Sequence, residues 1–86
     1  MMYYVYILRC VDKTYYVGYT SNFKERMERH HRGEVKYTSS RLPVDLVTVI
    51  ALPDKYKAIQ LEDYLKIDSG RAFTFKHFIW QSQKKR

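Results

Sequence analysis

Two tyrosine-rich stretches decide the fold: Tyr4-Val5-Tyr6-Ile7-Leu8 and, after a short gap, Tyr15-Tyr16-Val17-Gly18-Tyr19. Both are rich in the β-branched and aromatic residues that favour strands. We therefore predict antiparallel strands over residues 3–10 and 14–19, joined by a turn at residues 11–13. A glycine inside a strand costs stability, so Gly18 predicts a bulge or the close approach of another backbone or a ligand.

A helix is expected directly after this hairpin. Asn22 is a favourable N-cap and Glu25, three residues later, completes a capping box. The helix should cover residues 23–32 and stop at Gly33, which can adopt the left-handed conformation common at helix C-termini. Residues 34–43 are expected to form a basic loop.

The predicted first helix carries two kinds of residue at four-residue spacing. Phe23 and Met27 are apolar and predict a face buried against the sheet. Arg26 and His30 should share a second face that adjoins the tyrosine strands.

The remaining residues predict one more strand and two more helices. The alternating, β-branched stretch at residues 44–52 is expected to lie at the centre of the sheet because it is the most apolar. Asp54 should cap a helix over residues 55–67, and residues 71–81 can form a further helix. The order β-β-α-β-α-α indicates an α+β fold with a small, mostly antiparallel three-stranded sheet flanked by helices.

The chain length of 86 residues predicts one domain, over residues 1–82, followed by a basic tail at residues 83–86. The single cysteine, Cys10, excludes an intramolecular disulfide and is expected to be a packed thiol. Because no apolar run reaches the length of a membrane span and no signal segment opens the chain, we expect a cytoplasmic protein that does not enter membranes.

The positive charge is concentrated in two regions. The net charge is +7, with six Lys and Arg against three Glu in residues 21–41, and five Lys and Arg with no acid in residues 69–86. Such asymmetry indicates a polyanionic partner, with nucleic acid the leading candidate. Two plainer interpretations stay open: the basic surface merely aids solubility, and the tail is a disordered end instead of an arm that follows phosphates.

Several residues with reactive or charged side chains occur in an order that is known from a family of proteins. They are Tyr4-Val5-Tyr6, Tyr16-Val17-Gly18 ten residues further on, Arg26 and His30 on the first predicted helix, and Glu62 on the second. Together they resemble the GIY-YIG nuclease domain over nearly the whole chain. The stretches Arg41-Leu42-Pro43-Val44-Asp45-Leu46-Val47 and Ser69-Gly70-Arg71-Ala72-Phe73 look most similar to the small stand-alone bacterial members of that family.

The resemblance implies a role for each matching residue. Tyr6 corresponds to the tyrosine of the first motif, and Tyr16 and Gly18 to the second. Arg26 and His30 correspond to the family's helix residues. Glu62 corresponds to its single metal ligand. The chain departs from the family at Tyr4, where the first motif has a glycine.

By this resemblance the site would hydrolyse a phosphodiester. Glu62 would hold one Mg²⁺ or Mn²⁺ ion, weakly until the substrate supplies further oxygens. Arg26 would stabilise charge on the phosphate. Tyr6 is the candidate general base, with Tyr16 positioning water or phosphate and His30 orienting Tyr6 or relaying its proton. Which tyrosine is the base stays open.

Around this site, residues expected to bind nucleic acid are Lys24, Arg29, Lys36, Tyr37 and Arg41. Tyr37 could contact the phosphate or stack on an unpaired base.

Each of these residues taken alone also fits an ordinary role. Tyr6 and Tyr16 could be plain strand tyrosines, and Glu62 with Lys66 could be a helix-stabilising i,i+4 ion pair. Three functions therefore stay open. The first is a metal-dependent endonuclease acting on DNA more than RNA, on branched, nicked or single-stranded forms. The second is a catalytically weak or inactive nucleic-acid-binding module that acts with a protein partner. The third is a basic RNA- or ribosome-associated protein without a catalytic site. The sequence leaves the oligomeric state open.

Overall fold

The computed structural model describes residues 1–67. In chain order the elements are β1 (Tyr3–Cys10), β2 (Tyr15–Thr20), α1 (Phe23–His31), α2 (Lys36–Ser39), β3 (Val44–Leu52) and α3 (Lys55–Lys66). The three strands form one antiparallel sheet, so the predicted α+β fold class is confirmed. The helix expected at residues 71–81 and the basic tail at residues 83–86 lie outside the described residues.

The sheet has the strand order β2-β1-β3, so β1 is central and β3 lies at an edge. The prediction that residues 44–52 form the central strand is wrong. β1 is buried on both faces, with four consecutive buried residues from Val5 to Leu8. In β3, by contrast, Leu46 is 48% and Val49 39% exposed. A β-branched sequence predicts that a strand forms, but burial on both faces decides which strand is central.

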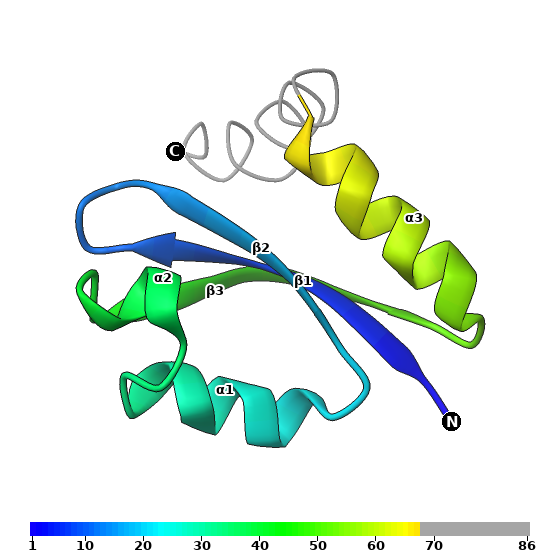
Figure 1. Ribbon diagram of the computed structural model, residues 1–86, viewed down its shortest axis with the longest axis horizontal. Helices are drawn as coiled ribbons and strands as arrows, with labels where there is room; N and C mark the ends of the chain where they lie inside the picture. Colours follow the sequence, from blue (N-terminus) through cyan, green and yellow to red (C-terminus); the bar gives the residue numbers. More distant parts are fainter. Residues whose placement is uncertain (68–86) are drawn as a thin grey trace, which may run out of the picture.

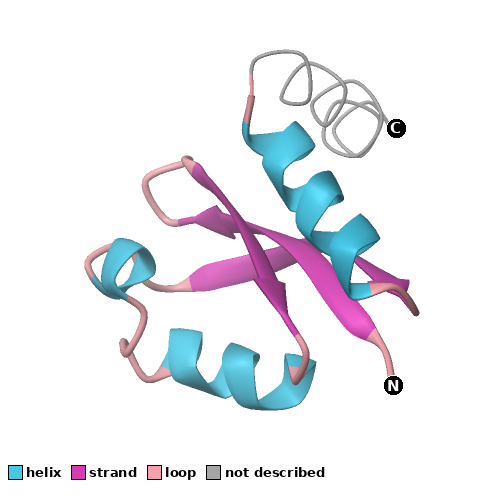
Figure 2. Cartoon of the chain, turned by 45° about the vertical axis from the view of Figure 1, so that its right-hand side comes forward, coloured by secondary structure: helices cyan, strands magenta, loops and turns pink. Residues whose placement is uncertain are grey.

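Helices cover both faces of the sheet, which gives three layers (Figure 1). One core contains Val5 and Ile7 of β1 with Ala58 and Leu65 of α3. The other contains alternate β1 residues, from Tyr6 to Cys10, packed against α1. Side chains along a strand point alternately to the two faces, so β1 contributes to both cores. Figure 2 shows the same separation of α1 and α3 from a second direction.

Both ends of α1 are capped, with Asn22 and Gly33 in the predicted positions, but the predicted capping box is wrong because the backbone N–H of Asn22 donates to Oγ1 of Thr20 at 3.0 Å instead of to Glu25. The Asn22 side chain accepts a hydrogen bond from the backbone N–H of Glu25 at 3.2 Å. At the other end Gly33 has φ +76° and donates its N–H to His30 O, while Glu34 N–H donates to Arg29 O. These two bonds form a Schellman motif, in which a glycine in the left-handed region ends the helix.

The division of α1 into two faces is wrong. His30 is completely buried, and Phe23 and Met27 pack on the same sheet face that His30 contacts. Positions separated by three and four residues fall within one stripe of a helix, so Phe23, Arg26, Met27 and His30 together form the side that faces the sheet.

A one-turn helix, α2, interrupts the loop expected at residues 34–43. Its Ser39 N–H donates to Val35 O at 2.9 Å, and its Thr38 is fully buried against His30. An isolated turn of helix is not stable by itself. Tertiary contacts therefore hold α2, which explains why local sequence did not predict it.

Cys10 is buried and carries a free thiol, as expected. Within residues 1–67, every helix is too short or too polar to cross a membrane.

Candidate active site

Tyr6 lies at the centre of the candidate site. It projects from the middle strand toward α1, and its side chain is fully buried. Gly18 is its partner residue on β2. A Cβ atom at Gly18 would lie 2.9 Å from Cε1 of Tyr6 and closer still to the hydroxyl end of the ring. The glycine is therefore required by the close approach of the Tyr6 ring, and the pairing of β1 with β2 continues past it without a bulge.

A chain of hydrogen bonds joins Tyr6 to α2. The Tyr6 hydroxyl is 2.8 Å from Nε2 of His30, and Nδ1 of His30 is 2.8 Å from Oγ1 of Thr38. Thr38 donates its own proton to Val35 O at 3.4 Å. Because the Thr38 hydroxyl donates its proton to Val35, its oxygen must accept a hydrogen bond from Nδ1–H of His30. Nε2 of His30 then carries no proton and accepts a hydrogen bond from the Tyr6 hydroxyl. Both ring nitrogens are thus satisfied inside the protein.

Burial keeps both members of the Tyr6–His30 pair neutral. It is the main cause that raises the pKa of the Tyr6 phenol to about 12, and the negative charge of Glu62 acts in the same direction. Burial also lowers the pKa of the His30 imidazole to about 4, with Arg26 as the next contributor. The guanidinium of Arg26 lowers the pKa of Tyr6, but burial outweighs this effect.

Arg26 lies beside this pair. Its Nη1 donates to Tyr19 O at 3.3 Å, which fixes the guanidinium against β2. Its Nε is buried and, among the described residues, has no hydrogen-bond partner. A buried donor without a partner costs about 1–3 kcal/mol, so this N–H is suited to an incoming anion.

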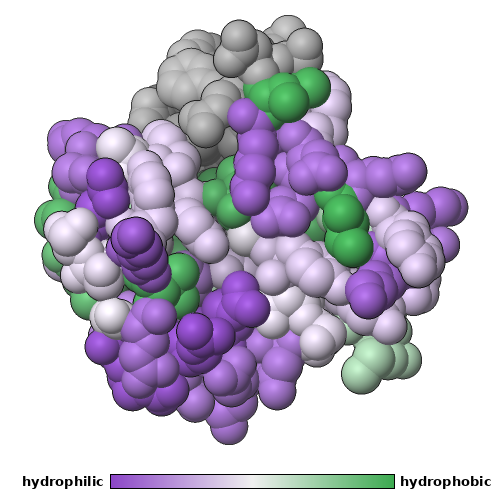
Figure 3. All heavy atoms as spheres, in the orientation of Figure 1, coloured by the Kyte–Doolittle hydropathy of each residue, from purple (hydrophilic) through white to green (hydrophobic). Residues whose placement is uncertain are grey.

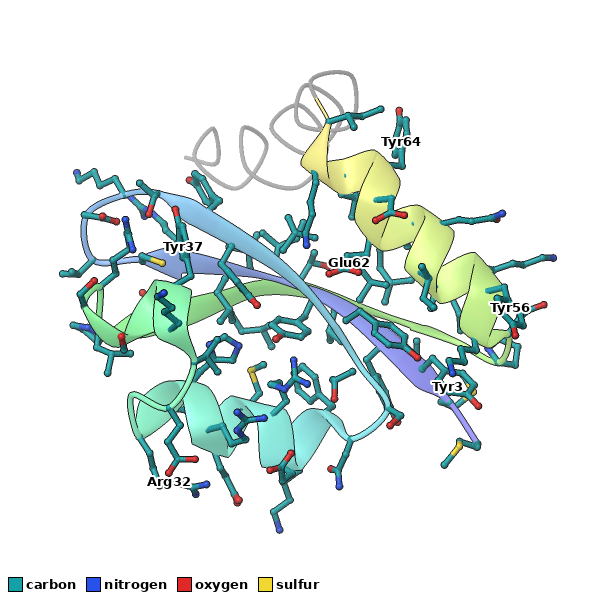
Figure 4. The ribbon with its side chains drawn as sticks, viewed as in Figure 1. Tyr3, Arg32, Tyr37, Tyr56, Glu62 and Tyr64 are labelled. Atoms are coloured by element: carbon teal, nitrogen blue, oxygen red, sulfur yellow. The ribbon has the colours of Figure 1, made fainter. Side chains whose placement is uncertain are left out.

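Glu62 reaches the site from the opposite helix. Figure 4 shows it projecting from α3 toward the sheet. Its side chain is 19% exposed, and Oε2 lies 2.9 Å from Nζ of Lys66, so the predicted i,i+4 ion pair is present. The carboxylate is close enough to Tyr6 to influence its pKa. This influence is smaller than that of burial, Arg26 or Tyr16, and it acts between residues that come from different layers.

The donor set fits a hard cation that keeps most of its own water. Among residues 1–67, no three His, Cys, Asp or Glu side chains are grouped to hold a metal ion. Glu62 supplies one carboxylate, and an ammonium group already occupies the cation-binding side of that carboxylate. Mg²⁺ is commonly held by one or two carboxylates with water and substrate phosphate oxygens, so a single carboxylate at this position is compatible with a divalent cation.

Tyr16 extends the site toward α2. Its ring centre is 6.2 Å from that of Tyr6 and 5.2 Å from that of His30. On its other side it packs on Tyr37, with ring centres 5.5 Å apart. Cζ of Arg41 lies 4.1 Å from the centre of the Tyr37 ring. These aromatic contacts link the candidate base to two of the residues expected to bind nucleic acid.

The other three residues of that expected set lie around the site instead of inside it. Lys24 on α1 and Lys36 on α2 are exposed, whereas Arg29 is part of an ion pair with Glu34 at 3.8 Å. Figure 3 shows that hydrophilic residues gather on the surface over α1.

Thr38 is the residue at this site that the sequence did not reveal. It orients His30, yet it stands in a Ser- and Thr-containing segment where no spacing or motif distinguishes it. Tyr4, at the departure from the first motif, packs on Phe23 with ring centres 5.7 Å apart. It therefore adds to the α1 side of the core without entering the Tyr6–His30 contact.

Comparison with known proteins identifies the family of the chain. The family model described as the GIY-YIG catalytic domain matches residues 2–76. A UPF0213 protein of Natronomonas pharaonis is 45% identical over 64 residues, covering 73% of this chain and 75% of that protein. The UPF0213 protein YsiG of Lactococcus lactis is 37% identical over 83 residues, covering 95% and 70%.

A solved structure supports the fold as well. The solution structure of a UPF0213 protein from Bacillus halodurans superposes with a TM-score of 0.57 at 32% identity, covering 99% of this chain and 96% of that one. The chain therefore belongs to the GIY-YIG domain family and is homologous to its UPF0213 members.

Proposed function

We propose that this protein is a cytoplasmic, divalent-metal-dependent endonuclease that hydrolyses phosphodiester bonds in DNA. Membership of the GIY-YIG family implies a nuclease, and hence a nucleic-acid substrate. The observation that carries the proposal is the position of the Tyr6 hydroxyl. It is hydrogen-bonded to His30 and lies within the electrostatic reach of both Arg26 and Glu62.

Glu62 would be the protein ligand of the metal ion, either Mg²⁺ or Mn²⁺. Nucleases of this family generally depend on a divalent metal. When bound, the ion would neutralise charge on the phosphate oxygens. A single carboxylate that must first exchange its partner Lys66 for the ion holds metal weakly without substrate.

Tyr6 would act as the general base and His30 as the acceptor of its proton. With a pKa near 12 the phenol is protonated at neutral pH, so it cannot take a proton without losing its own. The hydrogen bond to Nε2 of His30 gives that proton a destination. As the phenol oxygen takes a proton from the attacking water, the original phenol proton passes to the imidazole, which Thr38 holds in the required tautomer.

Arg26 would bind the non-bridging oxygens of the scissile phosphate. Its buried Nε–H would gain the hydrogen bond that it lacks, and its charge would stabilise the extra negative charge of the transition state. Gly18 serves the reaction by leaving the space that the Tyr6 ring fills.

A nucleic-acid-binding module with little or no catalysis is the second candidate. The raised pKa of Tyr6 favours it, because the charges of the chain alone do not activate the phenol. The net charge of +7 fits either function.

A cleavage assay separates the two candidates. Labelled duplex, nicked, branched and single-stranded DNA, with matched RNA, would be incubated with Mg²⁺, Mn²⁺ or a chelator. The proposal requires metal-dependent cleavage of at least one DNA form. Salt-sensitive binding of all forms with no cleavage would reject the nuclease and support the binding module.

A further inference from the structure

A hollow beside the candidate site has no role in the reaction described above. It lies between the outer strand β2, the short helix α2 and the end of α3, and has a volume of about 250 Å³. It is lined by Tyr15, Tyr16, Val17, Tyr37 and Lys66. Three of these five residues are tyrosines and one carries an ammonium group, so the hollow offers aromatic surface together with a positive charge.

The hollow adjoins the candidate site through a shared wall. Tyr16 lines the hollow and also packs on Tyr6 and His30, with ring centres 6.2 and 5.2 Å away. Lys66 lines the hollow and pairs with the candidate metal ligand Glu62 at 2.9 Å. A group bound in the hollow would therefore lie next to the group that reacts.

Tyr37 is exposed but held in place. The residue is 39% exposed, and its ring packs on that of Tyr16. Arg41 donates from Nη1 to Tyr37 O at 2.6 Å and from Nε to Asp12 Oδ2 at 3.0 Å, while its guanidinium lies over the Tyr37 ring. An aromatic ring fixed in advance loses little conformational entropy when a ligand packs on it.

The size of the hollow restricts what can enter. Its volume of about 250 Å³ accommodates one flat ring system. Nucleobases are flat, stack on aromatic side chains, and are joined to phosphates that an ammonium group attracts.

We propose that this hollow binds one unpaired nucleotide of the substrate, with its base against the tyrosine rings and its phosphate toward Lys66. The inference rests on the proposed function. It adds that the preferred substrate is a nucleic acid with an unpaired base next to the scissile phosphate. A continuous duplex presents no free base and gains nothing from the hollow.

Binding measurements with a chelator present test the proposal without cleavage. The probes are a labelled single-stranded DNA, a strand of equal length in which every base is replaced by an abasic site, and a duplex. The parent protein should bind the normal strand about ten-fold or more tightly than the abasic strand. Tyr37→Ala should remove most of that difference, while Tyr37→Phe, which retains the ring, should keep it within about two-fold.

The abasic strand carries the same phosphates, so it separates stacking from charge. Equal losses of affinity for both strands in Tyr37→Ala, or no loss for either, would overturn the proposal. Equal affinity of the parent protein for both strands would also overturn the proposal, and this measurement does not depend on the folding of any variant. A Tyr37-dependent difference without metal-dependent cleavage would keep the subsite and reject the nuclease, whereas cleavage without that difference would reject the subsite alone.

Discussion

The Tyr6 hydroxyl lies 2.8 Å from Nε2 of His30, across the boundary between the central strand and the first helix. Both side chains are fully buried, and burial displaces both pKa values so that neither group is charged at neutral pH. The pair is therefore a neutral donor and acceptor, in which a proton that leaves the phenol has one defined destination. The predictions below follow from this contact and from the charged groups around it.

Tyr6→Phe should abolish cleavage and also destabilise the fold. Removing the hydroxyl leaves Nε2 of the buried His30 without its hydrogen bond, which costs about 1–3 kcal/mol in the free energy of unfolding. Urea titration measures the stability, and an assay at one fixed substrate concentration measures the cleavage. The same substitution at a solvent-facing tyrosine, Tyr56→Phe, serves as the control and should change neither the stability nor the cleavage. A Tyr6→Phe protein that cuts at the parent rate would remove Tyr6 from the mechanism.

His30 should make the protein sensitive to acid. Its folded-state pKa of about 4 lies below the ordinary value of 6.5, so between these values the unfolded chain binds a proton that the folded chain does not. Stability should therefore fall as the pH drops below about 6.5, by about 2 kcal/mol between pH 7 and pH 5, and this loss should level off below about pH 4.

His30→Gln supplies the comparison, because glutamine does not titrate. Its stability should change by about 2 kcal/mol less than that of the parent between pH 7 and pH 5, as measured by urea titration at each pH. Parallel pH profiles of the two proteins would show that His30 is not responsible.

Gly18→Ala adds one methyl group, yet it should reduce both the stability of the fold and the rate of cleavage. The added Cβ would collide with the Tyr6 ring, which is buried and cannot turn away. We expect a loss of about 1–3 kcal/mol in stability and about a hundred-fold loss of cleavage, since a base displaced by an ångström is poorly placed.

Gly33→Ala is the matched control for Gly18→Ala. It places a side chain at φ +76° and should cost about 1–2 kcal/mol, but the atom nearest to the added Cβ is Cδ1 of Leu42 at 3.8 Å and not an atom of Tyr6. Equal losses of cleavage in the two variants would indicate that stability, and not the position of Tyr6, explains the effect.

Lys66→Met should strengthen metal binding in the absence of nucleic acid. The ammonium group at 2.9 Å competes with a metal ion for the Glu62 carboxylate, and its removal should raise the Mn²⁺ affinity about three- to ten-fold. Lys66→Arg keeps the charge and should bind Mn²⁺ as the parent does. Titration followed by the paramagnetic signal of free Mn²⁺ gives both values, and unchanged affinity in Lys66→Met would show that the ion does not bind at Glu62.

Most of the fold could be predicted from local sequence. The hairpin, the caps at Asn22 and Gly33 and the helix after Asp54 are set by residues close together in the chain, and the structure confirms them. The position of β3 and the existence of α2 could not be predicted in this way. Both depend on contacts between distant residues, such as the one between Thr38 and His30.

The candidate site, like the fold, could be predicted from the sequence only in part. The order of Tyr6, Gly18, Arg26 and His30 in the sequence identifies the region, and the structure brings these residues together. The sequence marks Gly18 as a place of close approach or a bulge, but it does not show that the approaching group is the Tyr6 ring or that burial raises the pKa of the phenol. These properties arise from packing, which a motif does not encode.

The most direct test of the nuclease is the cleavage of labelled DNA by the parent and by Glu62→Gln in Mn²⁺. Asp63→Asn, an exposed carboxylate on the same helix, is the control because it removes the same charge next to the site. We predict that the parent and Asp63→Asn cut the DNA only when metal is present, whereas Glu62→Gln binds it but does not cut. Cleavage by Glu62→Gln at the parent rate, or parent cleavage that persists in a chelator, would contradict a metal-dependent site at Glu62.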